Sequence, residues 1–285
     1  MKRKEQLIME NDIDKTREIV REVATHMVAY TGQSLIGIYG YVGNNLYRLV
    51  GTSTLFAFND RTYLLSAAHV LRHDANYEYL AHYAGPGVPP QKLHRVAEAY
   101  DDEHDVALVE VFPEAIGPTG KVALSIEHLA ADASDLAGDL LFFLGLPGAL
   151  SKTVGFNELH SDAMGYPTQL AVNQEGAGSG FFTIDYAAGD TGIDLQGNPT
   201  LAPPPNGASG SALWRTNRRG KRPDWRPEEA KIVGVLTRWV KEEKLIDVAS
   251  VEAVHKLFAT LDTTYKSSST PLVASAENTT SSHNT

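Results

Sequence analysis

The sequence predicts an all-β body in two successive halves, with one helix before it and one after it. Short runs rich in β-branched and aromatic residues, separated by Gly, Asn and Asp clusters, fill residues 34–111, as is typical of strands joined by turns. A second set of such runs follows a Gly-Pro-Thr-Gly break at 117–120. We therefore expect β-halves over 33–116 and 117–262.

The strands are predicted from nine stretches of the sequence. In the first half these are LIGIYGYV, LYRLVGTSTLFAF, TYLLSAAHV and DVALVEV. In the second half they are LLFFLGLPG, TQLAVN, GFFTIDY, SGSALWR and KIVGVLTRWV, with long Gly/Pro-rich connections between them.

Two amphipathic segments flank these strands. The first, over residues 14–30 of a helical extension at 1–32, is expected to pack onto the chain's own body rather than onto a partner. The second follows Asp247, whose side chain would cap its first turn. The Ser/Thr/Asn-rich segment 263–285 has little to bury and is expected to be a disordered tail. The apolar positions of the two helices are Ile19, Val20, Val23, Ala24, Met27 and Val28, and Val248, Val251, Val254, Leu257, Phe258 and Leu261.

The composition is that of a soluble globular chain, with 42% hydrophobic and 21% charged residues. A net charge of −10 gives no broad attraction to phosphates or anionic lipid, so neither nucleic acid nor a membrane is expected as a partner. The basic residues between 215 and 222 are interrupted by Gly220 and indicate a solvated loop.

The sequence contains no cysteine, which excludes disulfides and thiolate sites and fits a cytoplasmic location. Its basic start is not followed by the apolar run and cleavage site of a signal peptide, and no window is apolar enough to span a membrane.

Two segments of the first half carry side chains suited to acid-base chemistry. His69 follows an apolar strand and the small residues of SAAH, which leave the ring room at the strand's end. Asp105 stands where a polar stretch enters the buried run VALVEV, whereas the rival carboxylates Asp101 and Asp102 lack that run. Alone, each has a structural interpretation, as a histidine after a strand and as a surface aspartate.

A third segment, GASGSAL, offers a nucleophile. Gly207 and Gly210 permit backbone conformations that a side chain would obstruct around Ser209. The amides of Gly207 and Ser209 would then form an oxyanion hole. Taken alone, the motif is equally well a glycine-rich hairpin.

Together, the order His, Asp, Ser and the motifs SAAH, DVAL and GASGSAL resemble the trypsin-like serine peptidase superfamily, in its bacterial branch related to the glutamyl endopeptidases and heat-shock proteases. The resemblance covers residues 34–261 and includes GLPG at 145–148. It implies two six-stranded antiparallel β-barrels of the chymotrypsin-like kind with the triad between them.

The resemblance also implies a serine endopeptidase that cuts a protein or peptide substrate with no metal or organic cofactor. Ser209 would attack the carbonyl, His69 would act as base and then acid, and Asp105 would orient the ring. The substrate would lie along the strand at Leu236, Thr237 and Arg238.

Several positions depart from the family pattern. Ala208 replaces the aspartate that digestive members use for activation, and no Ile-Val-Gly-Gly start is present. Ser211 replaces a common second glycine, as also seen in the glutamyl-endopeptidase branch. Residues 156–202 match no motif, so the specificity pocket is not readable, and Arg238 is either a contact for an acidic side chain or an exposed strand residue.

Other functions fit less well. An α/β-hydrolase needs glycine at position 211 and a strand-to-helix turn, and a zinc peptidase needs Glu where Val70 stands between His69 and His73. A catalytically silent protein with the same fold that only binds a peptide or protein stays open. A cytoplasmic peptidase needs restraint, so a regulatory protein partner is expected, with the N-terminal helix as its candidate contact.

Overall fold

The computed structural model describes residues 2–72, 75–85, 89–116, 120–153, 159–171, 180–218 and 224–268, without the side chains of 2–14, 115 and 264–268. Four expectations fall wholly or partly outside these ranges: the Gly-Pro-Thr-Gly break, the end of the run TQLAVN, the basic loop beyond residue 218, and the tail 263–285 beyond residue 268. Residues 263–268 of that expected tail are helical instead.

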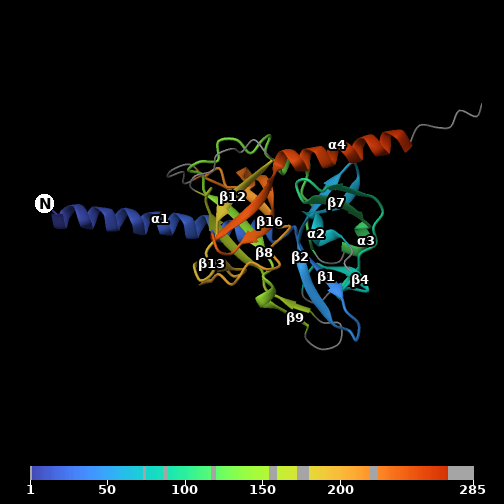
Figure 1. The fold of residues 1–285 in the computed structure, drawn as a ribbon. Helices are drawn as coiled ribbons and strands as arrows, with labels where there is room; N and C mark the ends of the chain where they lie inside the picture. Colours follow the sequence, from blue (N-terminus) through green and yellow to red (C-terminus); the bar gives the residue numbers. More distant parts are fainter. Residues whose placement is uncertain are drawn as a thin grey trace, which may run out of the picture.

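The first half is a seven-stranded antiparallel sheet, with the order β5-β4-β1-β2-β3-β7-β6 (Figure 1). Each predicted run of this half contains a strand because its apolar residues face a buried core. The strands are β1 (Leu35–Tyr41), β2 (Tyr47–Phe58), β3 (Arg61–Ala67), β4 (Tyr79–Tyr83), β5 (Gln91–Lys92), β6 (Glu98–Asp101) and β7 (Val106–Val111), and the half also holds two short helices, α2 (Ala68–Leu71) and α3 (Pro113–Ile116).

The second half is an eight-stranded antiparallel sheet, with the order β12-β17-β16-β15-β8-β11-β13-β14, beside a separate hairpin of β9 and β10. Its strands are β8 (Leu141–Gly145), β9 (Ser151–Thr153), β10 (Leu159–Ser161), β11 (Met164–Thr168), β12 (Phe181–Asp185), β13 (Thr191–Asp194), β14 (Pro199–Leu201), β15 (Ala212–Arg215), β16 (Lys231–Val240) and β17 (Leu245–Ser250). The 3-10 turns are η2 (Ile126–His128), η3 (Gly148–Leu150) and η4 (Pro227–Glu229).

Helix α1 (Lys2–Thr31) extends away from the body at its N-terminal end (Figure 1). Its last turns pack against β8, β11 and β13, where Val23, Ala24, Met27 and Val28 are buried. Lys121 donates a hydrogen bond from Nζ to the carbonyl of Gly32, directly after the helix, at 2.8 Å. The expected packing of this helix onto its own body is confirmed.

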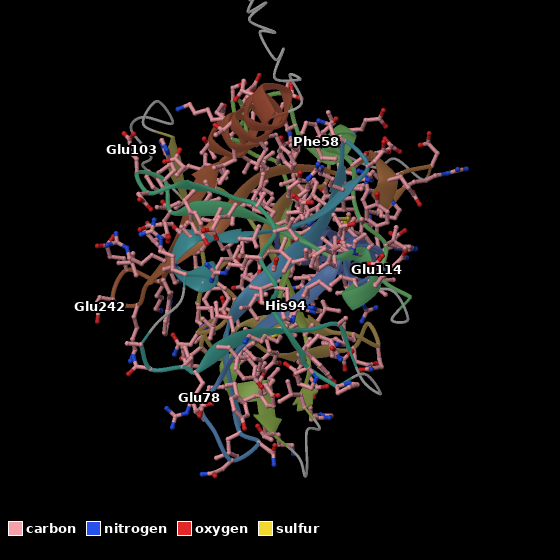
Figure 2. The ribbon with its side chains drawn as sticks, turned by 90° about the vertical axis from the view of Figure 1, so that its right-hand side faces the viewer. Phe58, Glu78, His94, Glu103, Glu114 and Glu242 are labelled. Atoms are coloured by element: carbon pink, nitrogen blue, oxygen red, sulfur yellow. The ribbon has the colours of Figure 1, made fainter. Side chains whose placement is uncertain are left out.

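Helix α4 (Val251–Ser268) lies across both sheets and contacts β6 and β7 of the first and β16 and β17 of the second. Phe258 packs its ring against Phe56, Phe58 and Tyr63 of the first sheet, at centroid distances of 5.7, 5.0 and 6.4 Å. Figure 2 looks onto the first sheet, with Phe58 near α4 and Glu78 at the opposite end.

The expected all-β class with two flanking helices is confirmed, with three corrections. The sheets hold seven and eight strands instead of six each, and closure into barrels stays a prediction. Asp247 does not cap α4: it lies inside β17 because residues 245–250 pair with β16 and β12, and the helix begins at Val251. The run TQLAVN at 168–173 is not a strand of its own over its described residues: β11 ends at Thr168, and only Leu170 forms an isolated bridge, to Ile184.

Within the described residues, no helix has both the length and the apolar character needed to cross a membrane.

Candidate active site

His69 lies in the single helical turn α2, directly after strand β3. Its neighbours Val70 and Leu71 are fully buried, which anchors the turn, while the imidazole side chain is 50% exposed. Asp105 precedes β7, next to β3 in the sheet, and its backbone carbonyl accepts a hydrogen bond from the Ala68 amide at 2.9 Å. Strand pairing therefore brings the two predicted residues together.

The carboxylate of Asp105 holds His69 at two points. Its Oδ1 accepts the backbone N–H of His69 at 2.9 Å, and its Oδ2 lies 2.7 Å from the ring Nδ1. A carboxylate oxygen only accepts, so the ring contact needs the proton on Nδ1 and leaves Nε2 with a free lone pair. Asp105 thus fixes both the orientation and the tautomer of the imidazole.

Asp105 adopts a left-handed backbone conformation, with φ of +53°. Aspartate tolerates this conformation better than most residues, at a modest energetic cost. The neighbouring carboxylates are engaged elsewhere: Asp102 forms an ion pair with Arg72, and Asp101 contacts His104. The structure therefore separates Asp105 from its two sequence rivals.

Ser209 lies in the loop before β15, and two glycines give that loop its shape. Gly207 and Gly210 have φ of +96° and +88°, which L-residues rarely adopt. A Cβ on Gly210 would overlap Ser66 Oγ and the Thr52 carbonyl oxygen, both from the first sheet. The nucleophile loop is thus packed directly against the strand that leads to His69.

A small-residue stretch in β2 forms the other side of this contact. A Cβ on Gly51 would lie 2.5 Å from Val70 Cγ2 and 2.9 Å from the carbonyl oxygen of Ser209. The Thr52 amide donates to that same carbonyl at 2.8 Å. Our sequence reasoning did not single out Gly51 or Thr52; the available signal was the run of small residues GTST inside an otherwise bulky strand.

The Ser209 hydroxyl donates to the backbone carbonyl of Thr237 in β16, at 2.9 Å. In this state the hydroxyl is directed to the strand at which a substrate was expected to lie. An attack assisted by His69 would require the hydroxyl to leave Thr237 by turning to another staggered rotamer about the Cα–Cβ bond.

The amides of Gly207 and Ser209, predicted to bind an oxyanion, have no hydrogen-bond acceptor among the described residues. Across the described part of the chain, neither the Gly207 nor the Ser209 N–H donates a hydrogen bond. Two such donors in one loop are suited to stabilising negative charge on a carbonyl oxygen.

Strand β16 has a free edge beside Ser209. Strand β15 pairs with it from Lys231 to Val235, and the Leu236 amide bonds to the Ser211 carbonyl at 2.9 Å. Beyond this point no described strand pairs with residues 237–240 on that side, although β17 covers the other side. A strand edge without a partner is the kind of element to which an extended peptide adds as a further strand.

The three predicted substrate residues differ in exposure. Leu236 and Thr237 are buried. Both backbone groups of Leu236 bond to the Ser209 loop, at Ser211 and Gly210, so the free edge begins at Thr237. Arg238 has a 75% exposed side chain whose Nε and Nη2 contact Asp247 Oδ2 at 2.8 and 2.7 Å. This pairing favours the exposed-strand interpretation of Arg238 over a contact for an acidic substrate side chain.

A second histidine–carboxylate pair lies just before Asp105. The buried His104 ring places Nδ1 2.8 Å from Asp101 Oδ2 and packs on Phe181 at 5.4 Å. Burial acts to raise the pKa of Asp101, but hydrogen bonds from His104 outweigh it and the pKa is lowered. Glu103 also lies close enough for a shared cation. Because His104 bonds to Asp101 of the first sheet and packs on Phe181 of the second, a structural role in joining the two sheets accounts for this group.

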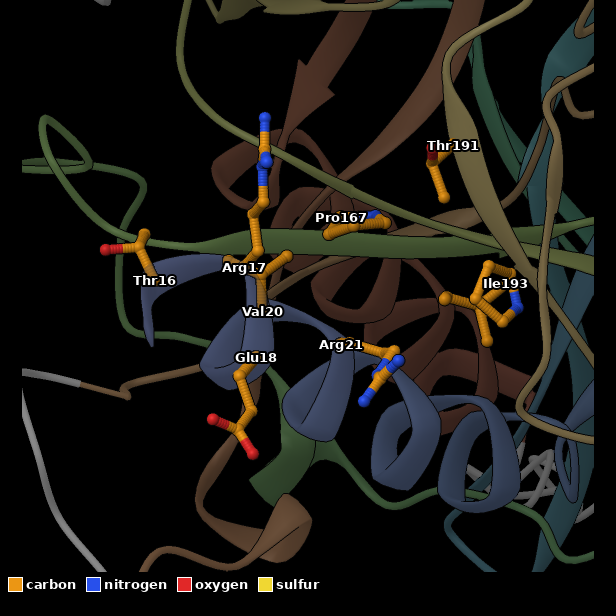
Figure 3. A pocket seen from close by; sticks show the side chains of 9 residues that line it. Thr16, Arg17, Glu18, Val20, Arg21, Pro167, Thr191 and Ile193 are labelled. Atoms are coloured by element: carbon orange, nitrogen blue, oxygen red, sulfur yellow. The ribbon is translucent and has the colours of Figure 1, made fainter. Parts of the chain in front are cut away.

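A groove of about 530 Å³ lies where α1 leaves the body, between that helix and Pro167, Thr191 and Ile193 (Figure 3). None of the nine residues that line it belongs to the His69, Asp105 and Ser209 set.

No family model matches the chain, and no curated protein matches its sequence. Among solved structures, it is similar to the active form of the Rv3671c protease from M. tuberculosis, with 18% identity, a TM-score of 0.47 and coverage of 83% of this chain and 84% of that one. It is also similar to a Glu endopeptidase in complex with MPD, with 15% identity, a TM-score of 0.47 and coverage of 83% and 93%. Likenesses this distant leave the chemistry to be read from this chain's own residues.

Proposed function

We propose that this chain is a serine endopeptidase that hydrolyses peptide bonds through Ser209, His69 and Asp105. The observation that carries the proposal is the two-point clamp of Asp105 on His69, beside a loop that holds Ser209 and two amides with no acceptor among the described residues. Acyl transfer by a serine needs these groups together.

Binding of the substrate would begin on the free edge of β16. A backbone N–H of the peptide would donate to the Thr237 carbonyl, which now accepts the Ser209 hydroxyl. Competition for this carbonyl would favour turning the hydroxyl toward His69 Nε2. Substrate docking would thus help to place the nucleophile.

The reaction would then follow two acyl-transfer steps. Ser209 Oγ attacks the scissile carbonyl while His69 takes its proton, and the amides of Gly207 and Ser209 donate to the resulting oxyanion. His69 returns the proton to the leaving amine, and water hydrolyses the acyl-enzyme by the same route. Asp105 stabilises the imidazolium that forms in each step. No step calls for a metal or an organic cofactor.

The second candidate is a protein that keeps the fold and binds a peptide without cutting it. One observation favours it: the Ser209 hydroxyl rests on Thr237 and not on His69. Such a protein would still bind an extended segment along β16, but its serine would not be activated.

Labelling by a fluorophosphonate probe distinguishes the two functions. The expected result is an adduct on Ser209 of wild type, located by mass spectrometry, and none in Ser209→Ala or His69→Ala. Ser211→Ala is the matched control, because this fully buried serine lies two residues away and should label like wild type. A folded wild-type protein without an adduct, even with an excess of peptide, would support the binding protein.

We also propose that a regulatory protein partner binds at α1 and restrains the peptidase activity. Deleting residues 1–30 would not test it, because Val23, Ala24, Met27 and Val28 belong to the core. Removing residues 1–14 spares those residues. Unchanged labelling and unchanged complex formation after this shorter deletion would argue against a regulatory role for that part of the helix.

A further inference from the structure

Thr52 ties the Ser209 loop to the first sheet through both its backbone and its side chain. Its amide donates to the Ser209 carbonyl at 2.8 Å, and its hydroxyl donates to the Gly207 carbonyl at 2.8 Å. The same hydroxyl accepts the Leu146 amide at 3.0 Å. Thr52 is completely buried, and so is its contact with the Leu146 amide.

A second contact orients the peptide unit that contains the Gly207 N–H. The carbonyl of Asn206 accepts the Gly148 amide at 2.6 Å. In a planar trans peptide the carbonyl and the following N–H point in opposite directions. Because Gly148 holds the Asn206 carbonyl, the Gly207 N–H points away from Gly148. On that side it has no hydrogen-bond acceptor among the described residues.

Both carbonyls that flank the Gly207 α-carbon therefore accept a hydrogen bond: that of Asn206 from the Gly148 amide, and that of Gly207 from the Thr52 hydroxyl. Gly207 has few restraints of its own, since its φ of +96° lies in a region open to glycine and it has no side chain. A Cβ there would come within 2.6 Å of the Leu146 carbonyl oxygen, so a bulkier residue cannot replace these contacts with its own packing. The orientation of the amide has to be imposed from outside the loop.

We propose that the Thr52 hydroxyl is a positioning group for the oxyanion hole, a role that rests on the proposed peptidase function. It does not touch substrate. It fixes the Gly207 carbonyl and, through the Leu146 amide, links it to the Gly145–Gly148 turn that holds Asn206. A valine would fill the same space but would leave the part-buried Gly207 carbonyl and the buried Leu146 N–H without the hydroxyl between them.

The test compares Thr52→Val, Thr52→Ser and the matched control Thr54→Val. Thr54 is a buried threonine two residues along the same strand, and none of the contacts described above depends on it. The measurements are kcat and KM for a cleaved peptide, the rate of fluorophosphonate labelling of Ser209, and the thermal unfolding midpoint.

The expected result for Thr52→Val is a kcat lower by roughly 10- to 100-fold with KM nearly unchanged, because losing one oxyanion donor outright costs about 10²- to 10³-fold and misorienting it costs less. Thr52→Ser should restore kcat to within a few fold, and Thr54→Val should keep it. The inference is overturned if folded Thr52→Val keeps the wild-type kcat, or if serine gives no rescue.

Failure of the peptidase proposal itself has a different signature, namely no labelling and no cleavage by wild type. In that case crystal structures of wild type and Thr52→Val decide the positioning role directly. A changed orientation of the Asn206–Gly207 peptide in the variant supports it, and an unchanged orientation overturns it.

Discussion

Acidification should destabilise this protein through one buried histidine, His82. It lies in β4, is 2% exposed, and within the described chain neither ring nitrogen has a hydrogen-bond partner. Burial, together with a smaller repulsion from His94, lowers the pKa of His82 from 6.5 to about 4. His94 is labelled on the face shown in Figure 2. The ring is therefore neutral in the folded protein near neutral pH.

The sign and size of the effect follow from these two pKa values. The unfolded chain binds a proton at His82 below about pH 6.5, whereas the folded protein resists it until about pH 4, so the free energy of unfolding falls as the pH falls through this window. At about 1.4 kcal/mol per pKa unit, the loss reaches about 3 kcal/mol near pH 4 and is constant below that. This is a large part of the stability of an ordinary domain.

The assay is urea unfolding of wild type and His82→Leu between about pH 7.5 and 4. Carboxylates that titrate in both proteins cancel in the difference, so the variant should lose about 3 kcal/mol less than wild type over the window. His94→Gln is the control: because burial is the larger cause, most of the wild-type loss should remain. Parallel pH profiles for wild type and His82→Leu would refute the reasoning.

Three further predictions concern the site and the body. Asp105→Asn should slow labelling of Ser209 by about 10³- to 10⁴-fold, because with its oxygen on the His69 N–H its NH₂ group faces Nδ1 and favours the wrong tautomer, whereas Asp102→Asn should label at the wild-type rate. Gly207→Ala should abolish labelling and lower the free energy of unfolding in urea by about 1–3 kcal/mol, because alanine is strained at φ of +96° and its Cβ would collide with the Leu146 carbonyl oxygen. Labelling and stability equal to those of wild type would contradict this. Phe258→Ala should lower the free energy of unfolding by about 3–5 kcal/mol by opening a cavity under α4, while Lys256→Ala, on the exposed side, should change it by less than about 0.5 kcal/mol.

The sequence was a good guide wherever the pattern was local. The runs that became β1, β2, β3, β7, β8, β12, β15 and β16 are apolar or alternating over their whole length, so burial of one face was readable. The second half of β17, residues 248–250, is expected from the sequence to be helical, because Val248, Val251 and Val254 also recur at helical spacing. These residues form a strand because they pair with β16 and β12, where Asp247 lies opposite Arg238 and Thr183. The pattern of a short sequence segment does not show which distant strands it will pair with.

The candidate site divides in the same way. The motifs around His69, Asp105 and Ser209 were readable because small residues and glycines mark where the backbone must come close. Thr52 and His82 were not readable, because each looks like an ordinary strand residue. The hydroxyl of Thr52 finds its acceptor 155 positions away, at Gly207, and only the docking of the two halves reveals that contact.

The two parts of the candidate site therefore depend on different levels of structure. His69 and Asp105 come from paired strands of one sheet, so their contact should persist as long as that sheet is intact. Ser209 belongs to the other half, and its loop contacts the first sheet at Gly51, Thr52 and Ser66. A Cβ added at Gly51 or Gly210 would collide with backbone atoms across this contact. Labelling of Ser209 should thus report how the two sheets are docked as well as the chemistry of the serine, and variants that loosen this contact should lose labelling before they lose the fold.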